Sequence, residues 1–350
     1  MKFKVLGVFI FSIISAALVF GASFFYFSEV ELYRELEHSI SNELSAKLAA
    51  IQISTQVRIV AAEKEKNIDL IFVGDIMLSR GVEQMVEKYG EGDWRYPFFN
   101  VVDALRSADL VFGNLEGPIS ARGKNQGSVY SFRADPAAVH GLTFAGFDVL
   151  SLANNHILDW GREALLDTIQ ILSSNGIHPV GAGKSEAEAN APLMVNVGEA
   201  KIAFLAFTDL YPKSFEARSD SPGVSSFNPT RIKKQISEIK NIGEADIVIV
   251  SLHWGEEYKT NANKKQIAIG HKLVDAGADL IIGHHPHVVQ EAERYNRAWI
   301  AYSLGNFIFD QNFDEATSRG LMLKVIVQNR KIEKVEEIPI KFTRTFQPYL

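Results

Sequence analysis

Two kinds of apolar pattern alternate along most of this chain. From Ile68 onward, short apolar runs rich in β-branched residues are followed by stretches whose apolar positions recur every three or four residues. The runs predict buried strands, and the stretches 81–89, 162–173, 231–242 and 264–276 predict amphipathic helices. Strands that alternate with helices indicate an α/β domain. The roughly 280 residues from Ile68 to the end suffice for one large core.

The pattern changes towards the C-terminus. Segments 299–304, 321–328 and 332–340 follow one another with little helix between them. We expect them to be antiparallel strands that complete a second sheet. Two segments rich in polar residues, 121–131 and 211–229, interrupt the alternation and are expected to be surface loops, which either contact substrate or only connect elements.

The N-terminal segment is uniformly apolar. Residues 5–27 carry no charge and, at about 1.5 Å per residue, can cross roughly 30 Å of hydrocarbon as a helix. Two lysines precede the segment and two glutamates follow it, so the positive-inside rule places residues 1–4 in the cytoplasm and the rest outside the cell membrane. The alternative is a signal peptide cleaved near Ala17, but the apolar run continues well past that position, which favours an uncleaved single-pass anchor.

Residues 28–67 predict a helical stalk and a linker. Apolar residues recur there at helical spacing: Leu32, Leu36, Ile40, Leu44, Leu48 and Ile51. Such a stripe either self-associates or packs on lipid or on the domain. We expect the linker at 52–67 and the main domain at 68–350.

Composition restricts the chemistry. The net charge of −6 argues against a nucleic-acid partner. Because the chain has no cysteine, it can form neither disulfides nor cysteine-ligated metal sites. Any metal must be held by histidine, carboxylate or amide groups.

Short polar clusters directly follow five of the apolar runs. They are Gly74-Asp75, the segment 113–116, Asn154-Asn155-His156, and the segments 251–255 and 283–287. In an open α/β sheet the carboxyl ends of the strands line one crevice, so we expect these clusters to converge. Carboxylates, carboxamides and imidazoles together form the ligand set of one or two divalent transition metals.

The clusters supply a set of candidate metal ligands: Asp75, Glu116, Asn155, His253, His285 and His287. Pro286 fixes its own φ and biases His285 towards an extended conformation, so His285 and His287 can point to one side while His284 faces elsewhere. For Asp75 the alternative is a cap on a helix that begins near Leu78.

Other polar residues are candidates for catalysis or substrate binding. His156 is expected to act as a general acid or to stabilise a transition state, oriented by Asp159, which could instead cap the helix that follows it. Glu256 is a weaker acid/base or substrate-binding candidate. Asn114 and Asn306 can supply amide groups to substrate oxygens or complete the site, although Asn306 also fits a tight turn.

Taken in order, the clusters resemble the CapA family of bacterial capsule-synthesis proteins, within the calcineurin-like metallophosphoesterases. The resemblance covers about residues 69–311 and rests on the clusters above together with Ala153, Val288, Gln290 and the segment 303–307. It implies a four-layer α/β/β/α sandwich with a two-metal site at the strand ends. It also implies a role in making or exporting poly-γ-glutamate or a related capsule polymer from a membrane anchor.

The chain departs from the wider metallophosphoesterase pattern at two positions. Met77 replaces the histidine of the Asp-x-His motif, and Ile157 replaces the acid that follows Asn155-His156.

Two functions therefore stay open. One is a metallohydrolase that uses Mn²⁺, Zn²⁺ or Fe on a phosphoryl or acyl centre; the other is a non-catalytic accessory that binds nascent polymer or a membrane synthase. The expected partners are membrane lipid, other capsule-synthesis membrane proteins and an anionic polymer. A TIM-barrel amidohydrolase is the rival fold.

Overall fold

The computed structural model describes residues 2–64 and 67–350, with the side chains of residues 12, 14–55 and 67–350. Two compact units, Met1–Lys66 and Asn67–Leu350, make up the chain.

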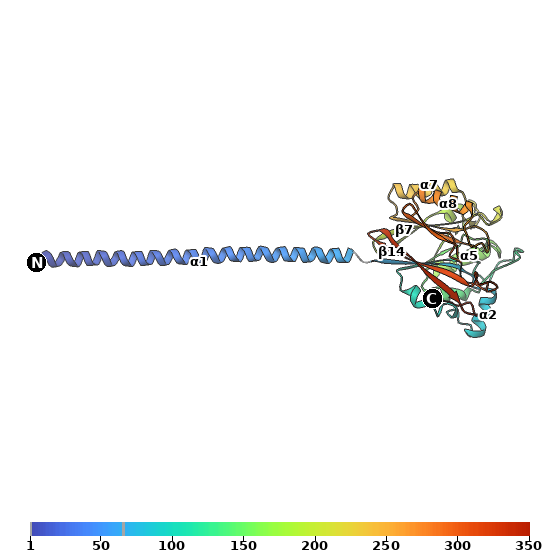
Figure 1. Ribbon diagram of the computed structural model, residues 1–350, viewed down its shortest axis with the longest axis horizontal. Coiled ribbons are helices and arrows are strands. Elements are labelled where there is room, and N and C mark those ends of the chain that lie inside the picture. The colour runs from blue at the N-terminus through green and yellow to red at the C-terminus, as the bar shows by residue number, and fades with distance from the viewer. Residues whose placement is uncertain (1, 65–66) are drawn as a thin grey trace. The chain divides into compact units, whose positions relative to one another are not determined.

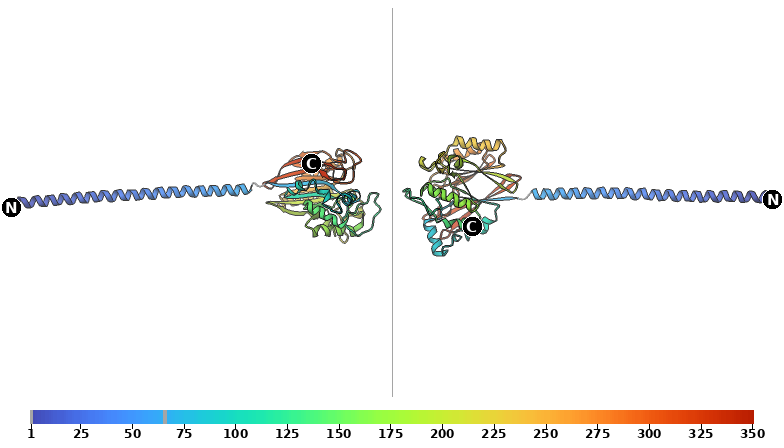
Figure 2. Two further views of the ribbon diagram at one scale, coloured as in Figure 1. Left: turned by 90° about the horizontal axis from the view of Figure 1, so that it is seen from below. Right: turned by 180° about the vertical axis from the view of Figure 1, so that it is seen from behind.

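The first unit is a single helix, α1 (Lys2–Lys64), unbroken in every view (Figures 1 and 2). It includes most of the segment for which we expected a linker, and the six apolar stalk positions are all exposed on it. By length and composition α1 could cross a membrane, since an 18-residue window within Ile14–Thr55 has a mean hydropathy of 1.2. The side chains of residues 5–11 and 13 in the predicted span, Met1 of the predicted tip and residues 65–66 of the predicted linker lie outside the described part.

The second unit contains two large sheets. In the described residues, eight strands form the first sheet, in the order β16-β15-β14-β1-β2-β3-β4 with β13 also paired to β1. They are β1 (Ile68–Ile76), β2 (Leu110–Leu115), β3 (Val149–Ser151), β4 (His178–Val180), β13 (Asn306–Ile308), β14 (Arg319–Gln328), β15 (Lys331–Phe342) and β16 (Pro348–Tyr349).

The second sheet has the order β11-β12-β10-β9-β7-β6 in the described part of the chain. Its strands are β6 (Leu193–Val197), β7 (Ala200–Thr208), β9 (Ile247–His253), β10 (Leu280–His284), β11 (Ala292–Tyr295) and β12 (Ala298–Ala301). A small separate ribbon pairs β5 (Ala182–Gly183) with β8 (Gly223–Val224).

Helices cover the outer faces of the two sheets. Apolar residues of α2, α4 and α5 pack in one core with the first sheet, and those of α7 and α8 pack in another with the second. Figure 1 shows α7 and α8 together on one side of the unit and α2 on the opposite side. The helices are α2 (Arg80–Tyr89), α3 (Val102–Arg106), α4 (Val139–Ala145), α5 (Gly161–Ser174), α6 (Glu186–Asn190), α7 (Pro229–Asn241) and α8 (Lys264–Asp275), with 3₁₀ turns η1 (Tyr96–Phe98), η2 (Pro136–Ala138) and η3 (Lys213–Phe215).

A third apolar core lies between the sheets and completes the four layers. In the first sheet the rings of Phe72 and Phe112 are neighbours, and Phe112 stacks on Phe204 of the second sheet with ring centroids 5.7 Å apart. The unit is therefore an α/β/β/α sandwich. Two stacked sheets exclude the TIM barrel, and the four predicted helices agree with α2, α5, α7 and α8 to within two residues.

The expectation for the last strands was only partly right. β14 and β15 do form an antiparallel hairpin, but β14 pairs with β1 in the first sheet. β12 belongs to the second sheet and runs parallel to β10. The reason is that β1 pairs with β2 on one side and leaves its other edge for a later strand. The pattern of a hairpin does not reveal which sheet it will join.

The inter-sheet core leads to a stability prediction. Phe112→Ala should lower the free energy of unfolding by about 3–5 kcal/mol, because it removes a fully buried ring that both sheets contact. Urea unfolding of the full-length protein in detergent, followed by tryptophan fluorescence, measures this, since all four tryptophans lie within residues 67–350. Phe313, which is 66% exposed, provides the matched Phe→Ala control and should cost less than about 1 kcal/mol. Equal losses in the two variants would contradict the assigned core.

Candidate metal centre

The candidate site lies where parallel strands of both sheets end. Asp75 on β1 stands beside Asn114 on β2 and beside Asn306 on β13. In the second sheet His284 at the end of β10 stands beside His253 at the end of β9. This register brings together polar clusters that are far apart in the sequence.

A first group of possible metal ligands consists of Asp75, Glu116 and His253. One ligand atom from each lies within 4.8 Å of the others, and all three side chains are buried. Asp75 is well satisfied within the protein: it accepts a hydrogen bond from Asn114 Nδ2 at 2.8 Å and one from the backbone N–H of His285 at 3.1 Å. Asp75 therefore does not cap a helix.

Glu116 is different, because neither carboxylate oxygen has a hydrogen-bond partner among the described residues. The nearest imidazole nitrogens, Nε2 of His287 and Nε2 of His156, are 3.7 Å and 3.8 Å from Oε1. These distances are too long for hydrogen bonds. A buried carboxylate in this state needs a cation or a proton, so the donor set fits a metal ion.

A second group adjoins the first and consists of Glu257, His285 and His287, whose ligand atoms also lie within 4.8 Å of one another. Nδ1 of His285 is buried and has no hydrogen-bond partner in the described part of the chain. The rings of His253 and His285 have centroids 4.9 Å apart, so the two groups are contiguous. Two neighbouring groups of this composition can hold one or two divalent cations.

The predicted amide ligand also reaches the cluster. Asn155 places Oδ1 2.7 Å from Nε2 of His253. The six residues predicted as ligands therefore lie in one place, which spans both sheets. Their assignment as ligands stays a prediction.

The charges of the cluster are strongly perturbed. Burial would raise the pKa of Asp75, but hydrogen bonds and charges from His284 and His287 hold it well below its usual range. Burial raises the pKa of Glu116 well above its usual range, against the attraction of His287 and with further repulsion from Asp75 and Glu257.

Two of the imidazoles are kept neutral. Burial lowers the pKa of His253 well below its ordinary value and lowers that of His285 to about 3. For His287 burial also opposes charge, but Glu116 and Asp75 raise its pKa to about 9. Neutral imidazole is the form that binds metals, so His253 and His285 are ready to act as ligands.

His156 is held by a buried acid. Asp159 accepts from Nδ1 of His156 at 2.7 Å, and its oxygens also accept from Ser128 Oγ at 2.8 Å and from the backbone N–H of Phe132 at 2.9 Å. The ring of Phe132 packs on the His156 ring, with centroids 4.1 Å apart. Asp159 makes no cap on α5, contrary to the alternative considered for it. The pair leaves Nε2 of His156 facing Glu116.

The two asparagines predicted to bind substrate are largely engaged within the protein. Asn114 bridges Asp75 and Asn154, whose Nδ2 donates to Asn114 Oδ1 at 3.2 Å. Asn306 places Oδ1 3.0 Å from Nδ1 of His287 and donates through Nδ2 to the carbonyl of Thr317. Both therefore orient neighbouring groups of the cluster.

Sequence reasoning missed His284. We expected it to face elsewhere, yet its Nδ1 lies 3.3 Å from Asp75 Oδ1, and the whole side chain is buried. The expectation assumed an extended segment. In fact His285 and His287 have φ of 97° and 57°, so side chains do not alternate there.

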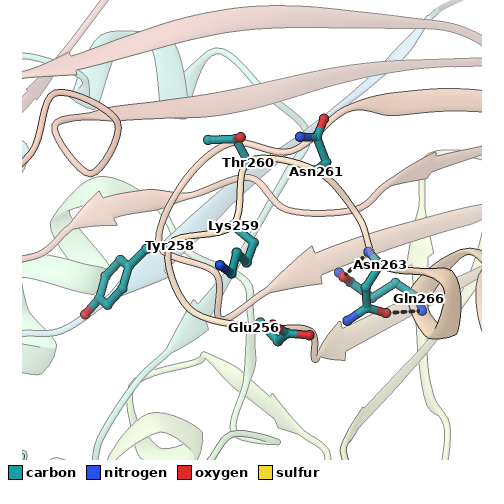
Figure 3. Close-up of a pocket in the computed structure, with 7 residues that line it drawn as sticks. All are labelled: Glu256, Tyr258, Lys259, Thr260, Asn261, Asn263 and Gln266. Carbon is teal, nitrogen blue, oxygen red and sulfur yellow. Dashed lines mark hydrogen bonds between the residues drawn. The ribbon is translucent and has the colours of Figure 1, made fainter.

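The sequence singled out Glu256 as an acid/base or substrate-binding candidate and did not single out its neighbour Glu257. Glu256 is exposed and lines a separate hollow of about 300 Å³, where it lies near Lys259 and Gln266 (Figure 3). Its neighbour Glu257 is the residue within reach of His285 and His287. Two adjacent acids in a turn give no periodic signal that distinguishes them.

Met77 shows how the departure from the metallophosphoesterase pattern is accommodated. Its side chain is fully buried, and its Sδ accepts from the backbone N–H and the hydroxyl of Ser79, at 3.2 Å and 3.0 Å. The Met77 side chain thus packs in the interior, and this position contributes no imidazole to the cluster.

Comparison with proteins of known sequence supports the resemblance. The model of the family described as bacterial capsule synthesis protein PGA_cap matches residues 69–311. A capsule biosynthesis protein CapA of Bacillus anthracis is 37% identical over 278 residues, which cover 78% of this chain and 67% of that protein. A PGA biosynthesis protein CapA of Bacillus subtilis is 38% identical over 255 residues, covering 72% of this chain and 66% of that protein. The chain thus spans about two thirds of these relatives.

A third relative is a probable polyglutamine synthesis accessory protein of Mycobacterium tuberculosis. It is 30% identical over 285 residues, covering 69% of this chain and 74% of that protein. Among solved structures, a phosphatase from Mycoplasma pneumoniae matches with a TM-score of 0.50 at 17% identity, covering 79% of this chain and 94% of the other. That likeness shows the metallophosphoesterase-like fold alone. On the family match and the Bacillus relatives, the chain belongs to the family of bacterial capsule synthesis proteins.

Proposed function

We propose that this protein is a membrane-anchored, extracytoplasmic metal-dependent hydrolase of capsule-polymer synthesis. The polymer is poly-γ-glutamate or a related polyanion, a proposal supported by the names of the Bacillus relatives. The protein would act beside other capsule-synthesis membrane proteins.

The observation that carries the proposal is that both carboxylate oxygens of Glu116 lack a hydrogen-bond partner among the described residues. A carboxylate that is 1% exposed and lacks hydrogen bonds costs several kcal/mol in a folded protein unless a cation or proton neutralises it. Imidazoles and a second carboxylate lie around it, which is the donor set of a divalent metal such as Mn²⁺, Zn²⁺ or Fe. Bound there, such a cation would stabilise charge that develops at a phosphoryl or acyl centre.

The chain's own residues supply the proton-transfer groups. Asp159 fixes the ring of His156 through Nδ1, and Phe132 packs against that ring, so Nε2 is aimed at the cluster. A histidine held this way can protonate a leaving group or stabilise developing charge. Glu257, exposed at the edge of the cluster, lies where it can contact the substrate.

A second function is supported by a specific observation. At the position where metallophosphoesterases have a histidine ligand, this chain has Met77, whose side chain packs in the interior. The Mycobacterium relative is described as an accessory protein. In this alternative the cluster holds metal for structure or binding, and the domain recruits polymer or a synthase without turnover.

The first prediction from the proposed function concerns the carboxylate on which that proposal rests, Glu116. Glu116→Gln should weaken divalent-metal affinity by about 100-fold or more, because it removes a negatively charged ligand from a buried site. Titration of the full-length protein with Mn²⁺ or Zn²⁺, with metal content measured after gel filtration, tests this. Glu256→Gln is the matched control and should bind metal like the wild type, since Glu256 lies in a separate exposed hollow. Unchanged metal affinity in Glu116→Gln would remove the main support for a metal centre.

A second prediction separates ligands from catalytic groups. His285→Ala should lower metal content, whereas His156→Ala should keep its metal and lose turnover by roughly 10²–10⁴-fold. The difference follows from position: His285 belongs to a ligand group, and His156 is tied to Asp159. Metal content and hydrolysis of a phosphodiester and of γ-glutamyl peptides should be measured on both variants. Loss of metal in His156→Ala would make that residue a ligand, and an inactive but metal-loaded wild type would favour the accessory function.

A third prediction concerns membrane topology. The chain has no cysteine, so single-cysteine variants can be labelled without background. Ser219→Cys, at an exposed position of the main domain, should react with a membrane-impermeant maleimide in intact cells. Lys2→Cys should react only after the cells are permeabilised. The reverse pattern would place the main domain in the cytoplasm.

A further inference from the structure

A basic hollow of about 920 Å³ lies away from the metal centre. It is formed by the end of α7, the turn between α8 and β10, the hairpin β11–β12 and the hairpin β14–β15. The cationic residues that line it are Lys240, Arg294, Arg297, Arg330 and Lys331. Segments distant in sequence thus gather positive charge in one place, although the whole chain has a net charge of −6.

The acids that line the basic hollow are already used to hold strands and side chains. Asp246 accepts from the backbone N–H of Lys201 at 2.8 Å, at the start of β7. Asp279 accepts from the backbone N–H of Val248 at 2.7 Å and pairs with Lys240 at 2.6 Å. The third acid, Asp275, accepts from an amide of the β11–β12 turn at 3.3 Å.

Most of the cations, in contrast, are uncommitted. Arg294, Arg297 and Lys331 are exposed, and their side chains make no hydrogen bond or ion pair with the side chains and backbone described for residues 67–350. Arg330 makes only a loose pair, with Nε 3.9 Å from Glu199 Oε2. Free positive charge therefore remains on the rim of the hollow.

Tight turns present these cations. In β14–β15, Gln328 pairs with Lys331 across a two-residue turn, whose Asn329 and Arg330 both have positive φ, at 48° and 60°. In β11–β12, Tyr295 pairs with Ala298 across an equally short turn. Two-residue hairpin turns restrict the backbone, so a ligand would meet charges that are already gathered.

We propose that the basic hollow is a binding site for an anionic polymer, which it recognises through carboxylates. Arginine presents a planar fork that matches a carboxylate, and three of the five cations are arginines. A membrane surface is the less favoured occupant, because none of the described residues that line the hollow is an exposed large apolar side chain of the kind that enters a bilayer. The identity of the polymer as the capsule polyanion rests on the proposed function.

The basic hollow and the metal centre lie at opposite ends of the same strands. Asp246 and Asp279 precede β9 and β10, and His253 and His284 end those strands. Seven residues of β9 at about 3.3 Å each put roughly 23 Å between the two ends. The hollow is therefore a separate site, where polymer can be held without occupying the metal cluster.

The test uses purified full-length protein in detergent and fluorescent poly-γ-glutamate as the probe. A triple variant, Arg294→Gln, Arg297→Gln and Lys331→Gln, should weaken binding about tenfold, the combined contribution of three exposed ion pairs. Its salt dependence should also be shallower than that of the wild type. The matched control, Arg218→Gln, Arg344→Gln and Lys184→Gln, removes the same number and kind of charges from exposed positions outside the hollow and should change binding less than twofold.

The outcomes are distinct. Equal binding by the wild type and the hollow variant, or equal weakening in both triple variants, overturns the proposal. So does a hollow variant that loses binding to anionic phospholipid vesicles while it binds polymer normally, because the occupant is then a membrane.

Metal content and hydrolysis, measured on the same preparations, separate this proposal from the proposed function. If the wild type holds metal and hydrolyses substrate while the hollow variant still binds polymer, only the proposal of a polymer site in the hollow fails. If the hollow variant loses polymer and the wild type holds no metal, the hollow stands and the metal-dependent hydrolase fails.

Discussion

The arrangement of this edge of the domain depends on one constraint, the burial of two carboxylates at adjacent strand ends. Asp75 and Glu116 follow apolar strands in the middle of a sheet, where water cannot solvate them. Asp75 is stabilised by an amide, a backbone N–H and nearby imidazoles. Glu116 has no such hydrogen-bond partners in the part of the chain that the structure describes. The difference leaves one buried carboxyl group, whose pKa burial raises well above its usual range, as the point in the cluster that a cation or a proton must satisfy.

Backbone close approach makes this arrangement possible. A Cβ on Gly74 would lie 1.9 Å from the carbonyl oxygen of Gly305, and one on Gly283 would lie 1.8 Å from that of Tyr302. Both glycines stand just before site residues at a strand end. Any side chain there would push β13 or the segment after β12 away, and the polar residues that follow would lose their mutual distances.

Much of the fold and of the candidate site could be predicted from sequence, and the failures have physical causes. Strand-end clusters were identifiable because parallel strands place their carboxyl ends together. The direction of the His284 side chain could not be predicted, because it depends on a left-handed backbone at His285 and His287, which a non-glycine residue rarely adopts. The sheet that β14 joins was not predictable either, since strands pair through backbone hydrogen bonds, which any free strand edge can provide.

The two ends of the central strands carry different groups, buried carboxylates and imidazoles at one end and exposed cations at the other, which bears on how a polyanion could be handled. The candidate metal centre buries the carboxylates of Asp75 and Glu116, and Glu116 has no hydrogen-bond partner there among the described residues, whereas the basic hollow presents exposed cations that attract a chain of carboxylates. The hollow lies next to the first residues of the domain, because β14, which ends at its rim, pairs with the start of β1. The exposed cations of the hollow therefore favour first association of a polyanion at that end. The proposed polymer binding and the proposed metal chemistry thus depend on different residues, at opposite ends of the same strands.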